Sequence, residues 1–151
     1  MKKASVLFLA LAMILSISSV GASASESNCV YYDDGSYDLI TVEVEDGVLT
    51  RAASSKTGTV TREHYSANNV LEWKISMKAT FTYNGQTSSC TVVNRPIITI
   101  YDSDWSVYSN TYSKSGNTAT GNVTMERDQL IGSVQVPVTL TLSCDKNGNL
   151  S

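Results

Sequence analysis

Histidine is nearly absent from this chain of 151 residues, because His64 is the only one. It follows Glu63 on an expected strand, where adjacent side chains point to opposite faces, so Glu63 does not orient it. The chain also has no GxSxG motif and no evident cysteine–histidine pair for nucleophilic catalysis. Paired carboxylates for glycoside cleavage stay open as an alternative, since folding brings distant acids together. We expect His64 to be exposed on a solvated strand, and we expect neither an enzyme nor a bound cofactor.

Basic side chains are also few. Lys2 and Lys3 belong to an N-terminal leader that is described below. The rest of the chain has nine Lys and Arg and fourteen Asp and Glu, which gives a net charge of −5. Residues 25–50 contain seven of the acidic side chains and no basic one. This balance argues against nucleic acid as a partner.

One long apolar run occurs in the sequence, and it covers residues 6–20. Two lysines precede it, and the small residues 22–24 follow it, which is typical of a secretory signal peptide over residues 1–24. The run fades into serines and falls short of the about 20 apolar residues that a membrane span requires. Cys29 lies too far from the run for lipid attachment. We therefore expect a secreted protein with no membrane partner after cleavage.

Helical periodicity is almost missing beyond residue 24, and apolar residues recur with a period of two. Along residues 73–83, Trp, Ile, Met, Ala, Phe and Tyr alternate with polar side chains. Asn84-Gly85 then predicts a type I′ hairpin turn that pairs Ala79 with Cys90. Frequent turn signals predict an antiparallel, immunoglobulin-like β-sandwich of about six to eight strands over residues 56–151. Pro137 predicts that the final strand is an edge strand or is bulged there.

Three cysteines in an oxidising compartment allow one bridge and one leftover thiol. Alternation places Cys90 and Cys144 on the inward faces of their strands, so we predict the bridge Cys90–Cys144. Such a bridge would stabilise the fold by about 4 kcal/mol in the chain-entropy account. The fate of Cys29 stays open.

The acidic segment 25–55 has three interpretations. It forms a strand pair, a flexible arm, or a propeptide released near Arg51. We interpret it as a partly ordered arm whose charge complements basic residues of the main domain, although a merely solvated acidic face is the commoner outcome.

The end of the chain resembles half of a calcium loop. Asp145, Asn147 and Asn149 have the right spacing, but the chain ends at Ser151 without the bidentate Glu that closes such a loop. Asp and Asn beside a Gly are also what a turn after a strand requires. We predict a turn and no metal.

A segment rich in tyrosine, serine and asparagine offers a candidate contact surface. If Trp105 points inward, alternation places Tyr108, Asn110 and Tyr112 together on the outward face. Mixtures of rings and small polar groups recur on recognition surfaces. We predict that these three residues contact a ligand.

The segments YDSDW, SKSGNTATGNVTM and TLTLSCDKNGNLS resemble small secreted proteins of Gram-positive bacteria whose function is unassigned. The resemblance covers residues 56–151, and the upstream segment YYDDGSYDLITVE has a weaker similarity to the same proteins. It implies an exported β-rich domain and brings no catalytic residues. Together these features predict a non-enzymatic extracellular binding module for a glycan or a protein. The alternative is a secreted effector or bacteriocin-like protein, processed near Arg51.

Overall fold

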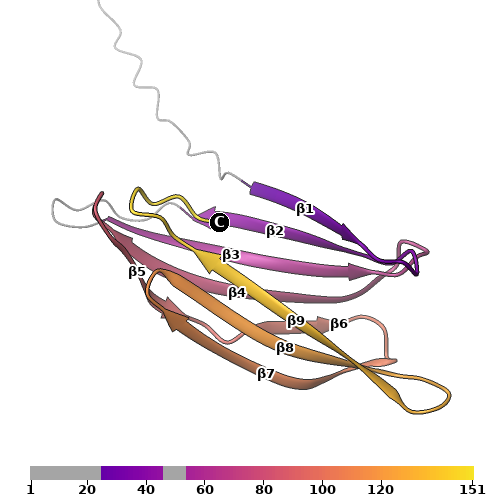
Figure 1. Ribbon diagram of the computed structural model, residues 1–151. Helices are drawn as coiled ribbons and strands as arrows, with labels where there is room; N and C mark the ends of the chain where they lie inside the picture. The colour runs from indigo at the N-terminus through magenta and orange to yellow at the C-terminus, as the bar shows by residue number, and fades with distance from the viewer. Residues whose placement is uncertain (1–24, 46–53) are drawn as a thin grey trace, which may run out of the picture.

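The computed structural model describes residues 25–45 and 54–151, which form nine β-strands and no helix (Figure 1). In these segments no helix is therefore long and apolar enough to cross a membrane. The strands are β1 (Ser25–Tyr31), β2 (Tyr37–Glu45), β3 (Ser54–Tyr65), β4 (Leu71–Tyr83), β5 (Ser88–Val93), β6 (Ile97–Ile100), β7 (Trp105–Ser115), β8 (Thr118–Asp128) and β9 (Ser133–Ser143). Every pairing between them is antiparallel. The predicted all-β antiparallel fold is confirmed.

Strands β1 to β6 form one sheet, in the order β1-β2-β3-β4-β5 with β6 also joined to β4. Strand β4 has thirteen residues and is long enough to serve both neighbours. One edge pairs with β3, and the other edge pairs with β6 near its start and with β5 near its end. Its alternating sequence buries Trp73, Ile75 and Met77, while Lys74 and Lys78 stay on the other face.

The second sheet has the order β7-β8-β9, and it packs against the first (Figure 1). Buried apolar side chains from both sheets form one core: Val60, Trp73, Ile75, Met77, Ala79, Phe81, Cys90, Trp105, Ala119, Val123, Met125, Val138, Leu140, Leu142 and Cys144. Pro137 lies on the edge strand β9 and pairs with Thr124, so the predicted edge position is confirmed. Each sheet consists of strands that follow one another in sequence. Immunoglobulin sheets mix strands from both halves of the chain, so this order does not show that topology.

The β4–β5 turn is wider than predicted. Tyr83 pairs with Ser88, which leaves a loop of residues 84–87. Gly85 has a φ of 84°, but Asn84 does not have the positive φ that a type I′ turn needs. Instead, Oδ1 of Asn84 accepts hydrogen bonds from the amides at positions 86 and 87, at 3.0 and 2.8 Å. As a result Cys90 pairs with Phe81 and not with Ala79.

The predicted Cys90–Cys144 bridge is wrong for this structure, in which the thiols of Cys29, Cys90 and Cys144 are all free. Cys90 and Cys144 are buried, as expected from alternation, but their thiols face separate backbone carbonyls. Sγ of Cys90 donates to the carbonyl of Val92 at 3.4 Å, and Sγ of Cys144 donates to that of Asp145 at 3.4 Å. Burial raises the pKa of both thiols. Cys29 is exposed on β1.

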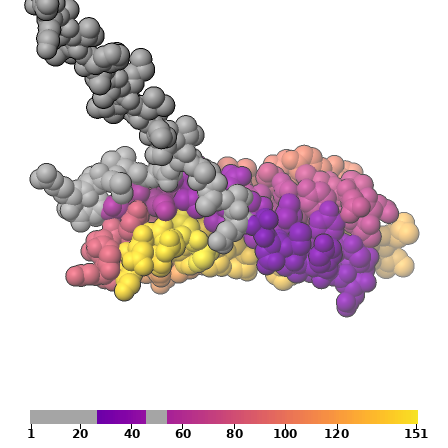
Figure 2. Space-filling view, turned by 90° about the horizontal axis from the view of Figure 1, so that it is seen from above, coloured from indigo at the N-terminus to yellow at the C-terminus, as the bar shows by residue number. Residues whose placement is uncertain are grey.

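The N-terminal acidic segment adds two strands to the larger sheet. Strand β2 pairs with β3 from Tyr37 to Glu45, and β1 pairs with β2. Of the three interpretations, the strand pair describes residues 25–45, and its first residues lie in indigo on the face shown in Figure 2. The expected charge complementarity occurs at Glu45, which binds Lys78 at 2.8 Å. Residues 1–24 and the region around Arg51 lie outside the described residues.

The segment after β9 is a turn built on Asp145. Its Oδ1 accepts hydrogen bonds from the amides of Asn147 and Asn149 at 2.8 and 2.9 Å, and its Oδ2 accepts one from Nδ2 of Asn149 at 2.8 Å. The Asp and Asn spacing that resembled a calcium loop is therefore accounted for by hydrogen bonds within the turn.

Candidate functional site

A pocket of about 280 Å³ lies between the two sheets, near the end where β1 turns into β2 and β8 turns into β9. Both sheets and two of the connecting loops contribute to its walls. The lining residues are Tyr32, Asp34, Ser36, Asp38, His64, Trp73, Trp105, Arg127, Gln129, Val134 and Val136. The pocket therefore combines aromatic rings, carboxylates, a guanidinium group and two valines.

Asp38 is the centre of the polar side of the pocket. It is 1% exposed, on the inward face of β2. Its Oδ2 accepts hydrogen bonds from the hydroxyl of Tyr32 at 2.6 Å and from Nε of Arg62 at 2.5 Å. Its Oδ1 lies 2.6 Å from Nδ1 of His64. Burial alone would raise the pKa of this carboxyl, but the hydrogen bonds from His64 and Tyr32 and the charge of Arg62 outweigh burial and lower it.

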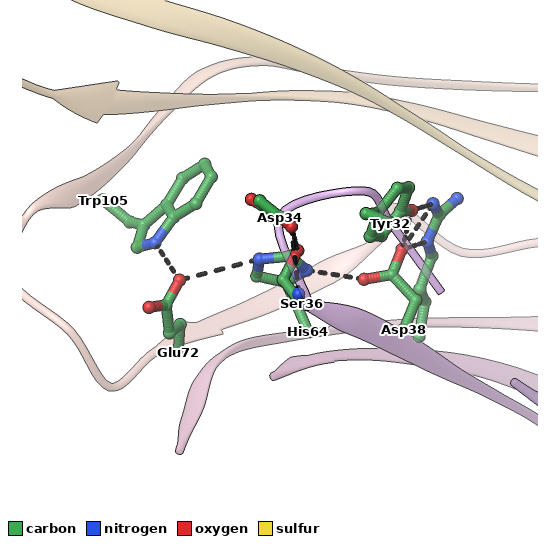
Figure 3. A network of polar contacts seen from close by, with 8 residues as sticks. Tyr32, Asp34, Ser36, Asp38, His64, Glu72 and Trp105 are labelled. Carbon is green, nitrogen blue, oxygen red and sulfur yellow. Dashed lines mark hydrogen bonds and ion pairs between the residues drawn. The ribbon is translucent and has the colours of Figure 1, made fainter. Parts of the chain in front are cut away.

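His64 continues this network toward a second buried carboxylate (Figure 3). Its Nε2 lies 3.6 Å from Oε2 of Glu72, which is also buried. The same oxygen accepts a hydrogen bond from Nε1 of Trp105 at 2.8 Å. Arg127 approaches the other oxygen of Glu72 at 3.7 Å. The polar row thus runs from Asp38 through His64 and Glu72 to the smaller sheet.

Aromatic rings pack along this row. The His64 imidazole stacks on Trp73 with centroids 4.9 Å apart, and it meets Trp105 edge-on at 5.7 Å. The two tryptophans are in T-shaped contact at 6.0 Å, and the guanidinium of Arg127 lies 5.4 Å from the Trp105 ring centroid. Within the described residues, Nε1 of Trp73 is buried without a hydrogen-bond acceptor. The rings give the pocket a rigid apolar wall.

Asp34 stands at the opening, in the loop between β1 and β2. Its Oδ1 accepts hydrogen bonds from the hydroxyl and the amide of Ser36 at 2.6 and 2.9 Å. These two hydrogen bonds lower the pKa of the Asp34 carboxyl, so it is ionised at neutral pH. In the described part of the chain, no donor from another residue reaches its Oδ2. This exposed carboxylate oxygen is available to a ligand.

The chemistry of this arrangement favours holding a ligand. Nδ1 of His64 lies within hydrogen-bond distance of Asp38, whereas Nε2 lies 3.6 Å from Glu72, which is beyond hydrogen-bond range. No group of three or more His, Cys, Asp or Glu in the described segments is arranged to hold a metal ion. Carboxylates accept hydrogen bonds here, while Arg127 and Gln129 supply donors, and the rings offer apolar faces.

The predicted contact residues Tyr108, Asn110 and Tyr112 are not part of this pocket and do not share one outward face. A register shift lies between Val107 and Ser109, which makes Tyr108 the extra residue of a β-bulge. Asn110 and Tyr112 then pair with the inward residues of β8, and Nδ2 of Asn110 donates to the carbonyl at position 96 at 2.8 Å. Tyr108 is 63% exposed, and Tyr112 is 45% exposed with Arg95 over its ring at 5.7 Å.

The expectation that His64 is an exposed strand residue is wrong, because its side chain is only 12% exposed. A signal for the network was present in the sequence. Asp38 alternates in step with Ile40 and Val42, which face the core from β2. Arg62 and His64 alternate in step with Val60, which faces the core from β3. Ionisable residues on the inward faces of neighbouring strands indicate a buried polar cluster.

Comparison with known proteins assigns no function to the chain. No family model matches the chain, and no curated protein matches it. Among solved structures, the chain is similar to a hypothetical protein of Listeria monocytogenes, with 17% sequence identity and a TM-score of 0.45. The alignment covers 87% of this chain and 95% of that one. A likeness this weak carries no argument about fold or function.

Proposed function

We propose that the protein is a secreted, non-enzymatic binding module that holds the end of an extracellular glycan in the pocket between its sheets. The observation that carries this proposal is the wall of rings, Trp105, Trp73 and Tyr32, beside the carboxylates of Asp34 and Asp38. A sugar ring has apolar C–H faces that lie against aromatic side chains. Its hydroxyls donate to carboxylates and accept from guanidinium and amide groups.

The size of the pocket supports a small group as the occupant. Pockets for drug-sized ligands have volumes of about 300–1,000 Å³, and this one has about 280 Å³. The ligand is therefore the terminal unit of a chain. Secretion is supported by the leader in residues 1–24.

Tryptophan fluorescence tests this proposal directly, because the chain contains two tryptophans and both line the pocket. The purified protein is titrated with a panel of oligosaccharides, and each response is checked by calorimetry. We expect saturable binding of one or more glycans with a change in emission. A panel that produces no binding by either method contradicts the proposal.

A matched pair of variants locates the site. Val134 lines the pocket and is 45% exposed, so Val134→Phe fills the space without disturbing the core. Val92 is 50% exposed on β5 and does not line the pocket, so Val92→Phe is its control. We expect glycan binding to be lost in the first variant and kept in the second. Loss of binding in Tyr108→Ala with Tyr112→Ala, and not in Val134→Phe, would instead place the site on β7.

A further inference from the structure

We infer that the terminal sugar held by this pocket carries a free amino group and that Asp34 receives the ammonium. This inference rests on the function proposed above and names the class of its ligand. It follows from which charged groups of the pocket already have partners, and from the charge of the loops around the opening.

The charged groups inside the pocket are largely paired with one another. Asp38 is engaged by Arg62 and His64, and Glu72 is engaged by Trp105 and Arg127. A cationic ligand therefore finds no unpaired carboxylate at the bottom of the pocket. Burying a charge without a partner is costly, so the charged group of a ligand has to lie at the opening.

At the opening, Asp34 provides the missing partner. Its Oδ1 is held by Ser36, which fixes the side chain, while its Oδ2 receives no hydrogen bond from another described residue. An ammonium group that donates to a carboxylate forms a charge-assisted hydrogen bond, about twice as strong as a neutral one. A carboxylate or phosphate on the ligand would be repelled at the same position.

The surrounding loops carry charge of the same sign. Asp128 and Asp104 adjoin pocket-lining residues in the sequence, Arg127 and Trp105, and the amide of Asp128 donates to the carbonyl of Asp104 at 2.8 Å. Asp104 and Asp128 are exposed. Arg127 lines the pocket and opposes this charge, but the acidic side chains outnumber it, so the field at the opening attracts a cationic ligand.

A pair of oligosaccharides that differ in one feature tests this inference. The purified protein is titrated with a glucosamine trisaccharide and with its fully N-acetylated form, which has the same rings and linkages but no positive charge. We expect the glucosamine form to bind up to about fivefold more tightly, because an ion pair with an exposed carboxylate contributes less than a buried one. Raising the salt concentration should reduce the difference, because the carboxylate is exposed.

Two variants decide whether Asp34 is responsible. Asp34→Asn keeps an Oδ1 acceptor for Ser36 and removes the charge, so we expect the turn to persist and the preference to disappear. Asp33→Asn removes the same charge from a neighbouring exposed residue that does not line the pocket, and it should keep the preference. Equal or tighter binding of the N-acetylated form overturns the inference while leaving the proposed function intact. Binding of some other neutral or acidic glycan, but of neither trisaccharide, has the same consequence, whereas no glycan binding at all contradicts the proposed function itself.

Discussion

At the scale of single residues, the two tryptophans of the pocket differ by one hydrogen bond. Nε1 of Trp105 donates to the buried Glu72 carboxylate at 2.8 Å, whereas Nε1 of Trp73 has no acceptor among the described residues. Replacement by Phe exchanges the indole for the smaller phenyl ring at both positions, so the loss of ring size is the same. We therefore expect Trp105→Phe to lower the free energy of unfolding by about 1.5–3 kcal/mol more than Trp73→Phe, the range for a hydrogen bond to a charged group. Urea unfolding of the two variants measures this difference, and equal losses would show that the Trp105–Glu72 bond does not stabilise the fold.

The three thiols provide a second test at this scale. Cys29 is exposed, whereas Cys90 and Cys144 are buried and their pKa values are raised by burial. Because the thiolate is the reactive form, a raised pKa lowers the reactive fraction at neutral pH. We expect a small alkylating reagent to modify one thiol per native molecule and all three after denaturation without reductant, as counted by mass spectrometry. A Cys90–Cys144 linked peptide would instead restore the bridge predicted by alternation.

At the scale of the strands, Gly121 determines how closely the β5–β6 connection approaches β8. A Cβ at this position would lie 2.7 Å from Cγ of Pro96 and 3.0 Å from Sδ of Met77. We expect Gly121→Ala to cost about 1–3 kcal/mol, as overpacking of a core does. Asn122→Ala, at the exposed neighbouring position, is the control and should stay within about 0.5 kcal/mol. Thermal unfolding of both variants checks this, and equal stabilities would mean that Pro96 moves aside freely.

Strand β7 shows how far periodicity predicts an element and where it fails. The existence of the strand and the inward position of Trp105 follow from alternation and are observed. The bulge at Tyr108 reverses the faces of the residues that follow it, including Asn110 and Tyr112. An inserted residue has no signature in a polar sequence, because either face of this segment tolerates serine, asparagine and tyrosine. The predicted shared outward face is wrong for this reason, while ligand contact by these residues stays a prediction.

The pocket shows a different limit of sequence reasoning. The alternation of side chains along a strand places Asp38, Arg62 and His64 on the inward faces of β2 and β3, so part of the polar network was predictable. The contribution of Trp105 was not, because it comes from the other sheet and depends on how the two sheets face each other. Packing between sheets is set by the shapes of many side chains together. Local alternation contains no information about it.

At the scale of the whole molecule, the buried network links the N-terminal hairpin to both sheets. Asp38 on β2 binds Arg62 and His64 on β3, and Glu72 on β4 binds Trp105 on β7. The sandwich is therefore joined at its pocket end by ionised groups as well as by the apolar core. Its stability should depend on pH in a direction that the carboxyl pKa values determine.

Asp38 contributes to the loss of this stability in acid. Burial raises the pKa of its carboxyl, but the hydrogen bonds from His64 and Tyr32 and the charge of Arg62 more than offset this, so the folded-state pKa lies below the ordinary value of about 3.9. A depressed carboxyl pKa means that the unfolded chain binds the proton more readily. The stabilisation is then complete above about pH 5 and is lost as the pH falls below the unfolded value and through the folded one.

Asp38→Asn isolates this contribution, because Asp34 and Asp145 also have lowered pKa values and add to the acid sensitivity of the natural protein. At neutral pH we expect the variant to be about 1–3 kcal/mol less stable, since Arg62 loses its buried counter-charge. As the pH falls through the lowered folded-state pKa the natural carboxyl becomes protonated, so the two proteins should converge in stability. Urea unfolding of both proteins at several pH values measures the gap. A gap of constant size from neutral to acid pH would mean that Asp38 acts through its shape and not through its charge, because only the charge is removed by protonation.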